Sequence, residues 1–246
     1  MTTPAPSTFS RPGILPDTMA AAGICCVTPA EALDRVGQSV SGLWIPYPGV
    51  AVDGQPYGRI RLSLPTGDRK YTQREASGAH AYVPEHFEHL REQPDLVIVE
   101  GEFKALSLCE AGIRAVGIGG VTSALERPAD NPGAPRRLLF ELADHLARWP
   151  AKRVLFLGDS DTAFSMAFAH EAVALARVAT PASLILPRIP ISLPKGIDDV
   201  REHLGNGPEF TAWWARAVAD AVEVSYWDAE VWASRRVTAR SEEHTS

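Results

Sequence analysis

Three short acidic motifs in this chain have the residue types and spacing for metal-ion chemistry. The acids are Glu100, Asp159, Asp161, Asp198 and Asp199. The first two motifs directly follow continuous apolar runs at 96–99 and 154–157, which predict buried parallel strands. The carboxyl ends of adjacent parallel strands meet in one crevice, and so many like charges repel each other unless a cation lies among them. The pattern predicts a site for Mg²⁺, with Mn²⁺ as the alternative, and a phosphate-bearing substrate.

The elements that would position these acids begin near residue 95, where apolar runs start to alternate with helical patterns. Strands are predicted at 96–99, 115–118, 154–157 and 183–186. Helices are predicted at 102–110, 135–149, 163–178, 197–204 and 208–222. This alternation implies right-handed crossovers and an α/β fold with a parallel four-stranded sheet.

A β-rich, basic segment precedes this region. Turn signals divide residues 43–74 into short strands, and in 57–64 the arginines alternate with Ile60, Leu62 and Leu64. Residues 57–74 contain one acid and five basic residues, which are Arg59, Arg61, Arg69, Lys70 and Arg74. With Tyr57 and Tyr71 as stacking faces, this strip could hold nucleotides or unpaired bases. The alternative is a solvated hairpin whose charges protect a strand edge from aggregation.

The segments VIVEGEFKAL, LFLGDSD and PKGIDDV resemble the three motifs of the TOPRIM domain, which bacterial-type primases, topoisomerases and some nucleases share. The wording VEGxxKA and KGIDD is similar to a domain-of-unknown-function family with a TOPRIM-like core, found in phage and plasmid replication proteins and often ahead of a helicase domain. GLWIPYPG, YGRIRL and RKYTQ resemble the basic segment that precedes this core in bacterial primases and lines the template and nucleotide path. The resemblance covers about residues 14–205 and implies a TOPRIM-like Rossmannoid core.

The resemblance also implies residue roles. Glu100 would be a metal ligand or the general acid/base, Asp159 and Asp161 would hold Mg²⁺, and Asp198 and Asp199 would lie at or near the metal. Lys104 would act near the incoming phosphate, at a position where primases usually carry an acid, and Lys195 could neutralise phosphate charge. The structural alternative for the acids is helix capping and interaction with helix dipoles.

Three functions remain open at this point. They are a primase-like nucleotidyltransferase, a TOPRIM nuclease and a non-catalytic module that binds nucleic acid or a partner. The expected partners are single-stranded DNA, NTPs and a helicase domain in a C-terminal continuation. The tail 240–246 (RSEEHTS) is identical to what a common sequencing adapter encodes in one frame, which indicates a truncated reading frame.

Composition sets further bounds on the chain. Its 246 residues are 45% hydrophobic, enough for a sizeable core, and the net charge of −6 excludes a generally basic nucleic-acid coat. We expect no membrane span and no secretory signal. Three cysteines without metal-site spacing, with Cys25 and Cys26 expected to be buried and reduced, indicate the cytoplasm. The expected divisions are a disordered 1–13, an N-terminal helix plus a basic β-rich subdomain at 14–94, the TOPRIM-like domain at 95–205, a helical extension at 206–239 and the adapter-like tail.

Overall fold

The computed structural model describes residues 11, 13–67, 69–128, 131, 133–179 and 182–224. Most of the stretch expected to be disordered, the second half of the expected helical extension and the adapter-like tail lie outside the described residues. Arg11 and Gly13 are described and make defined contacts with residues 94 to 188 positions away. The prediction of disorder through residue 13 was therefore wrong at its C-terminal end.

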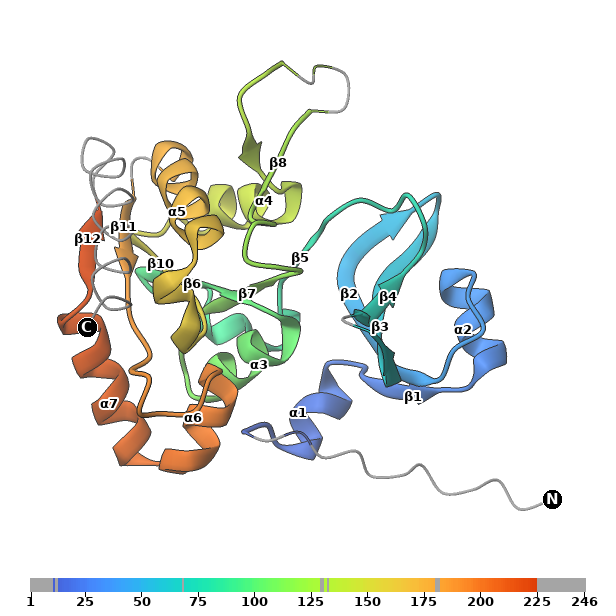
Figure 1. Ribbon diagram of the computed structural model, residues 1–246, viewed down its shortest axis with the longest axis horizontal. Helices are drawn as coiled ribbons and strands as arrows, with labels where there is room; N and C mark the ends of the chain where they lie inside the picture. Colours follow the sequence, from blue (N-terminus) through green and yellow to red (C-terminus); the bar gives the residue numbers. More distant parts are fainter. Residues whose placement is uncertain are drawn as a thin grey trace.

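The basic segment forms a small antiparallel sheet, in which the order of the described strands is β1 (Cys25–Val27), β2 (Gly42–Val52), β3 (Gln55–Thr66) and β4 (Arg69–Gln73). Helix α2 (Pro29–Val36) starts at a capping box made by Thr28 and Glu31, which satisfies two free backbone donors. It covers one face of the sheet (Figure 1), where Ile60 is fully buried. Arg59 and Arg61 lie on the opposite face, as the alternation predicts, whereas Leu64 is 84% exposed and ends the pattern.

The larger sheet has six strands among the described residues, in the order β12 (Val222–Val224), β11 (Ser183–Leu186), β10 (Arg153–Leu157), β6 (Asp95–Glu100), β7 (Ala115–Ile118) and β5 (Ala81–Tyr82). The four central strands are mutually parallel, which confirms the α/β prediction. The edge strands β12 and β5 run antiparallel to their neighbours β11 and β7, so the prediction of a four-stranded sheet missed these two strands. These edge strands have two or three residues, too few for a periodic signal.

Helices cover both faces of the larger sheet (Figure 1). Helices α3 (Glu102–Glu110), α6 (Ile197–Leu204) and α7 (Pro208–Ala219) pack on the face formed by Val97, Val99 and Leu155. Helices α4 (Phe140–Arg148) and α5 (Met166–Val178) pack on the other face, against Ile98 and Phe156. None of the described helices combines the length and apolarity that crossing a membrane requires.

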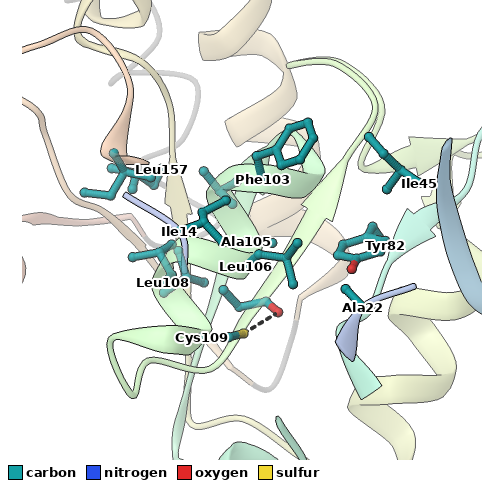
Figure 2. Close-up of a cluster of buried hydrophobic side chains, with 14 of the residues drawn as sticks. Ile14, Ala22, Ile45, Tyr82, Phe103, Ala105, Leu106, Leu108, Cys109 and Leu157 are labelled. Carbon is teal, nitrogen blue, oxygen red and sulfur yellow. Dashed lines mark hydrogen bonds between the residues drawn. The ribbon is translucent and has the colours of Figure 1, made fainter. Parts of the chain in front are cut away.

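The small sheet and the α/β body share one hydrophobic core. Ile45, Tyr47 and Tyr57 of the small sheet pack into the cluster that includes α1 (Pro16–Ala21), α3 and the larger sheet. Figure 2 shows Ile45, Tyr82 and Phe103 among its members. Because burial of apolar side chains is the main stabilising term in folding, this shared core fixes the basic face of the small sheet against the α/β body.

Several predicted boundaries were wrong. The helix expected at 135–149 begins at Phe140, because Arg137–Leu138 (β9) pairs with Leu125–Glu126 (β8). The helix expected at 163–178 divides into a 3-10 turn η2 (Ser160–Phe164) and α5, whose N-cap is Ser165. A second 3-10 segment, η1 (Glu85–Leu90), precedes β6. Cys25 and Cys26 are exposed rather than buried, because they lie on the short edge strand β1.

Candidate active site

An open pocket of about 770 Å³ lies between the small sheet and the carboxyl ends of the parallel strands. All five acids predicted from the sequence line it. The pocket is also lined by most of the predicted basic strip, namely Arg59, Arg61, Arg69, Lys70 and Tyr71. The two lysines that were predicted to lie near phosphate, Lys104 and Lys195, line it as well. We call Glu100, Asp159, Asp161, Asp198 and Asp199 the acidic wall, and Arg59, Arg61, Arg69 and Lys70 the basic wall.

The strand register brings the first two acidic motifs together. Strands β6 and β10 are parallel neighbours, with Val99 opposite Leu157, so Glu100 and the segment from Gly158 to Asp161 leave the sheet side by side. Gly101 follows Glu100 with a φ of 104°, a conformation that glycine adopts without steric cost, and helix α3 starts at the next residue. Lys104 therefore projects from the first turn of α3 into the same pocket.

Glu100 is half-buried beside other carboxylates. Burial is the largest effect and raises the pKa of Glu100, and the negative charges of Asp159 and Asp161 act in the same direction. Lys104 and Lys195 oppose this increase. A carboxyl group with a raised pKa holds a proton closer to neutral pH, which suits it for proton transfer as well as for metal binding.

Basic side chains contact three members of the acidic wall. Lys104 Nζ donates to Asp159 Oδ1, and both side chains are 15% exposed. Lys195 Nζ lies 2.7 Å from Asp161 Oδ2, and this hydrogen bond raises the pKa of Lys195. Arg11 Nη2 lies 2.9 Å from Asp198 Oδ2. Much of the negative charge of the wall is therefore balanced by the chain itself.

The donor chemistry of the acidic wall fits a hard divalent cation such as Mg²⁺, which prefers carboxylate oxygens. Asp198 is fully buried, yet its Oδ1 has no hydrogen-bond partner among the described residues. A Cβ at Gly196 would lie 2.6 Å from this oxygen and 3.3 Å from Asp199 Oδ2, so glycine is required for the close approach. Within the described ranges, however, no three possible ligands are gathered around one point. Metal binding would therefore require some of these acids to move or to exchange a basic partner such as Lys195 or Arg11 for the ion.

The basic wall is held by aromatic contacts. The guanidinium carbon of Arg59 lies 4.5 Å from the centroid of the Tyr71 ring, and Arg61 Nη1 donates to the Tyr71 hydroxyl at 3.3 Å. Contacts of this kind stabilise a cation over an aromatic face. Arg69 and Lys70 are exposed at the rim of the pocket. Tyr71 and the two exposed cations are therefore placed to meet a polyanionic ligand.

Two members of the predicted strip do not reach the site. Arg74 is turned away and donates to the backbone carbonyl of Arg35 at 3.2 Å, so the structure does not bring it into the pocket. Tyr57 is buried, with its hydroxyl 2.9 Å from Gln73 Oε1, which makes it unavailable for stacking on bases. The prediction that Tyr57 supplies a stacking face was wrong because the α/β body covers that end of β3.

Glu102 and Arg11 line the pocket without having been predicted. Glu102 is 1% exposed, and its Oε1 accepts from the Tyr47 hydroxyl at 2.6 Å and from Arg59 Nη1 at 2.9 Å. Its Oε2 has no partner in the part of the chain that the structure describes. The second acid of Glu100-Gly101-Glu102 was the available signal. Arg11 had none, because its partner Asp198 lies 187 residues away.

Residues 87–206 match the model of a family described as a domain of unknown function (DUF3854). Among solved structures, the zinc-binding and RNA polymerase domains of Aquifex aeolicus primase match with a TM-score of 0.59 and 19% identity. The match covers 86% of this chain and 54% of the other. The chain has a primase-like fold. It spans about half the length of the Aquifex chain.

A second primase structure has the same fold. The RNA polymerase domain of Mycobacterium tuberculosis primase DnaG matches with a TM-score of 0.52 and 13% identity, over 84% of this chain and 72% of the other. The comparison with curated proteins gives no match. The primase-like fold thus includes both the small basic sheet and the α/β body, since the matches cover more of the chain than either part alone contains.

Proposed function

We propose that this chain is the Mg²⁺-dependent, primase-like nucleic-acid module of a mobile-element DNA replication protein, and that it forms phosphodiester bonds from nucleotides. The observation that carries the proposal is the pocket itself, where three carboxylates at or just after the ends of β6 and β10 and two from the first turn of α6 face a basic wall from a different sheet. Nucleotidyl transfer needs both features, because the substrates are polyanions and the metal needs oxygen ligands. The primase-like fold supports the same assignment.

In this proposal, Glu100, Asp159, Asp161 and Asp198 hold the metal, with Asp199 beside them. When bound, Mg²⁺ supplies charge neutralisation and alignment at the reacting phosphate. Lys104 and Lys195 contact nucleotide phosphates, since both already pair with anionic groups in the pocket. If Glu100 is not itself a ligand, its alternative role is that of general acid/base, which burial favours by raising its pKa.

The basic wall has the task of holding nucleic acid. Arg61, Arg69 and Lys70 contact the backbone of single-stranded DNA, and Tyr71 supplies an aromatic face. Arg59 is paired with Glu102 and is only 13% exposed, so in this proposal it positions Tyr71 and does not contact the nucleic acid itself. Lys195, at the other side of the pocket, is 61% exposed, and its solvent-exposed pair with Asp161 is weak enough to exchange for a phosphate.

The test is incorporation of labelled NTPs on single-stranded DNA in the presence of Mg²⁺ or Mn²⁺. The expected result is product formation by the wild-type chain and its loss in the Asp159→Asn/Asp161→Asn double variant. Asp144→Asn is the matched control, because Asp144 lies outside the pocket and forms an exposed pair with Arg148. Equal incorporation by the wild type and the double variant would refute the proposal.

The same reagents separate the alternatives. Metal-dependent nicking of plasmid DNA without NTP incorporation would indicate a TOPRIM nuclease. Metal-independent binding of DNA without turnover would indicate a recruitment module. The helicase partner and the cytoplasmic location stay predictions.

A further inference from the structure

The charges of the acidic wall do not cancel. Lys104, Lys195 and Arg11 each neutralise one of its five carboxylates. Glu100 and Asp199 have no ion-pair partner within the described part of the chain, which leaves two negative charges on the wall. The nearby Glu102 is already paired with Arg59 and adds nothing to this excess. One divalent cation would balance the remainder.

The position of Lys104 explains why only a small negative charge stays unbalanced on the acidic wall. Its Nζ contacts Asp159, and its Cε lies 3.0 Å from the place that a Cβ of Gly196 would occupy. The lysine therefore lies between the second acidic motif and the third. Both members of its pair are 15% exposed, so solvent screens the interaction little. Lys104 is the most sheltered of the lysines in the pocket, because Lys195 is 61% exposed and Lys70 is also exposed.

A second, independent feature points to a cation on the wall. Asp198 Oδ1 is buried without a hydrogen-bond partner among the described residues, at the pocket edge of α6. A buried carboxylate oxygen in that condition costs free energy unless something positive reaches it. Lys104 approaches Gly196 with its methylene carbon, while its ammonium group is directed to Asp159. The oxygen is thus left for another ligand.

We propose that the acidic wall binds one divalent cation and that Lys104 is a fixed internal cation in the place of a second. This inference rests on the metal-dependent function proposed above, and it concerns how many ions the site takes. Lys104 and the single metal ion would share the charge of the transferring phosphate. A carboxylate at position 104 would instead add a ligand between Asp159 and Asp198.

Binding of Mn²⁺ to the full chain tests the inference without any measurement of turnover. Electron paramagnetic resonance of free Mn²⁺ gives both the stoichiometry and the affinity. The wild type is expected to bind one ion per chain. Lys104→Gln is expected to bind one ion at least about tenfold more tightly, because a positive charge close to the metal is removed. Lys104→Glu is expected to bind two ions.

The matched control is Lys152→Gln, which makes the same change of charge at an exposed lysine outside the pocket. Its Mn²⁺ affinity should stay within about twofold of the wild type, because solvent screens distant charges. Two or more ions of similar affinity in the wild type would overturn the inference, as would a Lys104→Gln affinity no different from that of the control. Absence of Mn²⁺ binding in both the wild type and Lys104→Gln would overturn the proposed metal-dependent function as well. Thermal unfolding verifies folding, and Lys104→Gln alone decides if Lys104→Glu fails to fold.

Discussion

Replacing Glu102 by alanine removes the group that ties the small sheet to helix α3. Glu102 is 1% exposed, and one of its oxygens accepts from both Tyr47 and Arg59. The variant would leave the Arg59 guanidinium, which is 13% exposed, without its carboxylate, and the buried Tyr47 hydroxyl without its acceptor. We therefore expect Glu102→Ala to destabilise the protein and to displace the basic wall.

The magnitude follows from the burial of the pair. Removing one partner of a buried ion pair costs about 3–5 kcal/mol, because the other charge stays buried and uncompensated. Removing both partners avoids that penalty, so Glu102→Ala/Arg59→Met should recover much of the loss. Glu102→Gln keeps an acceptor for Tyr47 and should cost less than alanine.

The assay is urea unfolding followed by circular dichroism, with Asp144→Ala as the control. Asp144 and Arg148 form an exposed pair four residues apart on α4, a type of pair worth about 0.3–0.5 kcal/mol. The reasoning would be refuted if Glu102→Ala lowered the free energy of unfolding no more than Asp144→Ala does, or if adding Arg59→Met made the protein still less stable.

Three further predictions address pH and salt. The hydrogen bond between His80 and Glu141 raises the pKa of His80 above 6.5. Burial acts to raise the pKa of Glu141, but the hydrogen bonds from His80 and from the backbone N–H of Ala81 outweigh it and lower this pKa below 4.5. The pair should therefore stabilise the fold most between about pH 4.5 and 6.5, and lose this effect as pH rises through the raised pKa of His80. In urea unfolding, Glu141→Gln should lower the free energy of unfolding more at pH 5.5 than at pH 8.5. Burial, followed by the charge of Arg114, lowers the pKa of His145 from 6.5 to about 4. The free energy of unfolding should therefore be unaffected by this histidine above pH 6.5 and fall by up to roughly 3 kcal/mol as pH drops toward 4. His145→Gln should flatten this pH dependence, and an unchanged slope would contradict the prediction. Replacing Arg61 and Lys70 by alanine should weaken binding of single-stranded DNA and reduce its logarithmic salt slope by about 0.7 per lost phosphate contact, whereas Arg137→Ala, a change at an exposed residue outside the pocket, should leave the slope unchanged.

The acidic wall was predictable because its position depends on local sequence. Continuous apolar runs identify β6 and β10, and because the carboxyl ends of parallel strands share one edge of the sheet, Glu100 and Asp159 were expected to lie close together. The capping box of Thr28 and Glu31, which starts α2, is equally local in sequence. The edge strands β5 and β12 carry too few residues to produce such a signal.

The rest of the pocket depends on which surfaces the tertiary fold covers. Tyr57, Arg59 and Arg61 alternate along one face of β3, so the pattern treats them alike. In the structure, Tyr47 and His80 lie 4.9 and 4.4 Å from Tyr57, ring to ring, and bury it, whereas Arg61 lines the pocket. Arg11 reaches Asp198 across 187 residues. Sequence periodicity identifies which residues share a face of a strand. Only the packing of the rest of the protein against that face decides which of these residues remain accessible.

The most direct test of the central claim is an anomalous difference map from crystals soaked in Mn²⁺. The account predicts one peak in contact with carboxylate oxygens of the acidic wall, among Glu100, the Asp159/Asp161 segment and Asp198, with Lys104 still beside Asp159. A map without a peak at the acidic wall, or with its strongest peak bound elsewhere on the chain, would contradict the account.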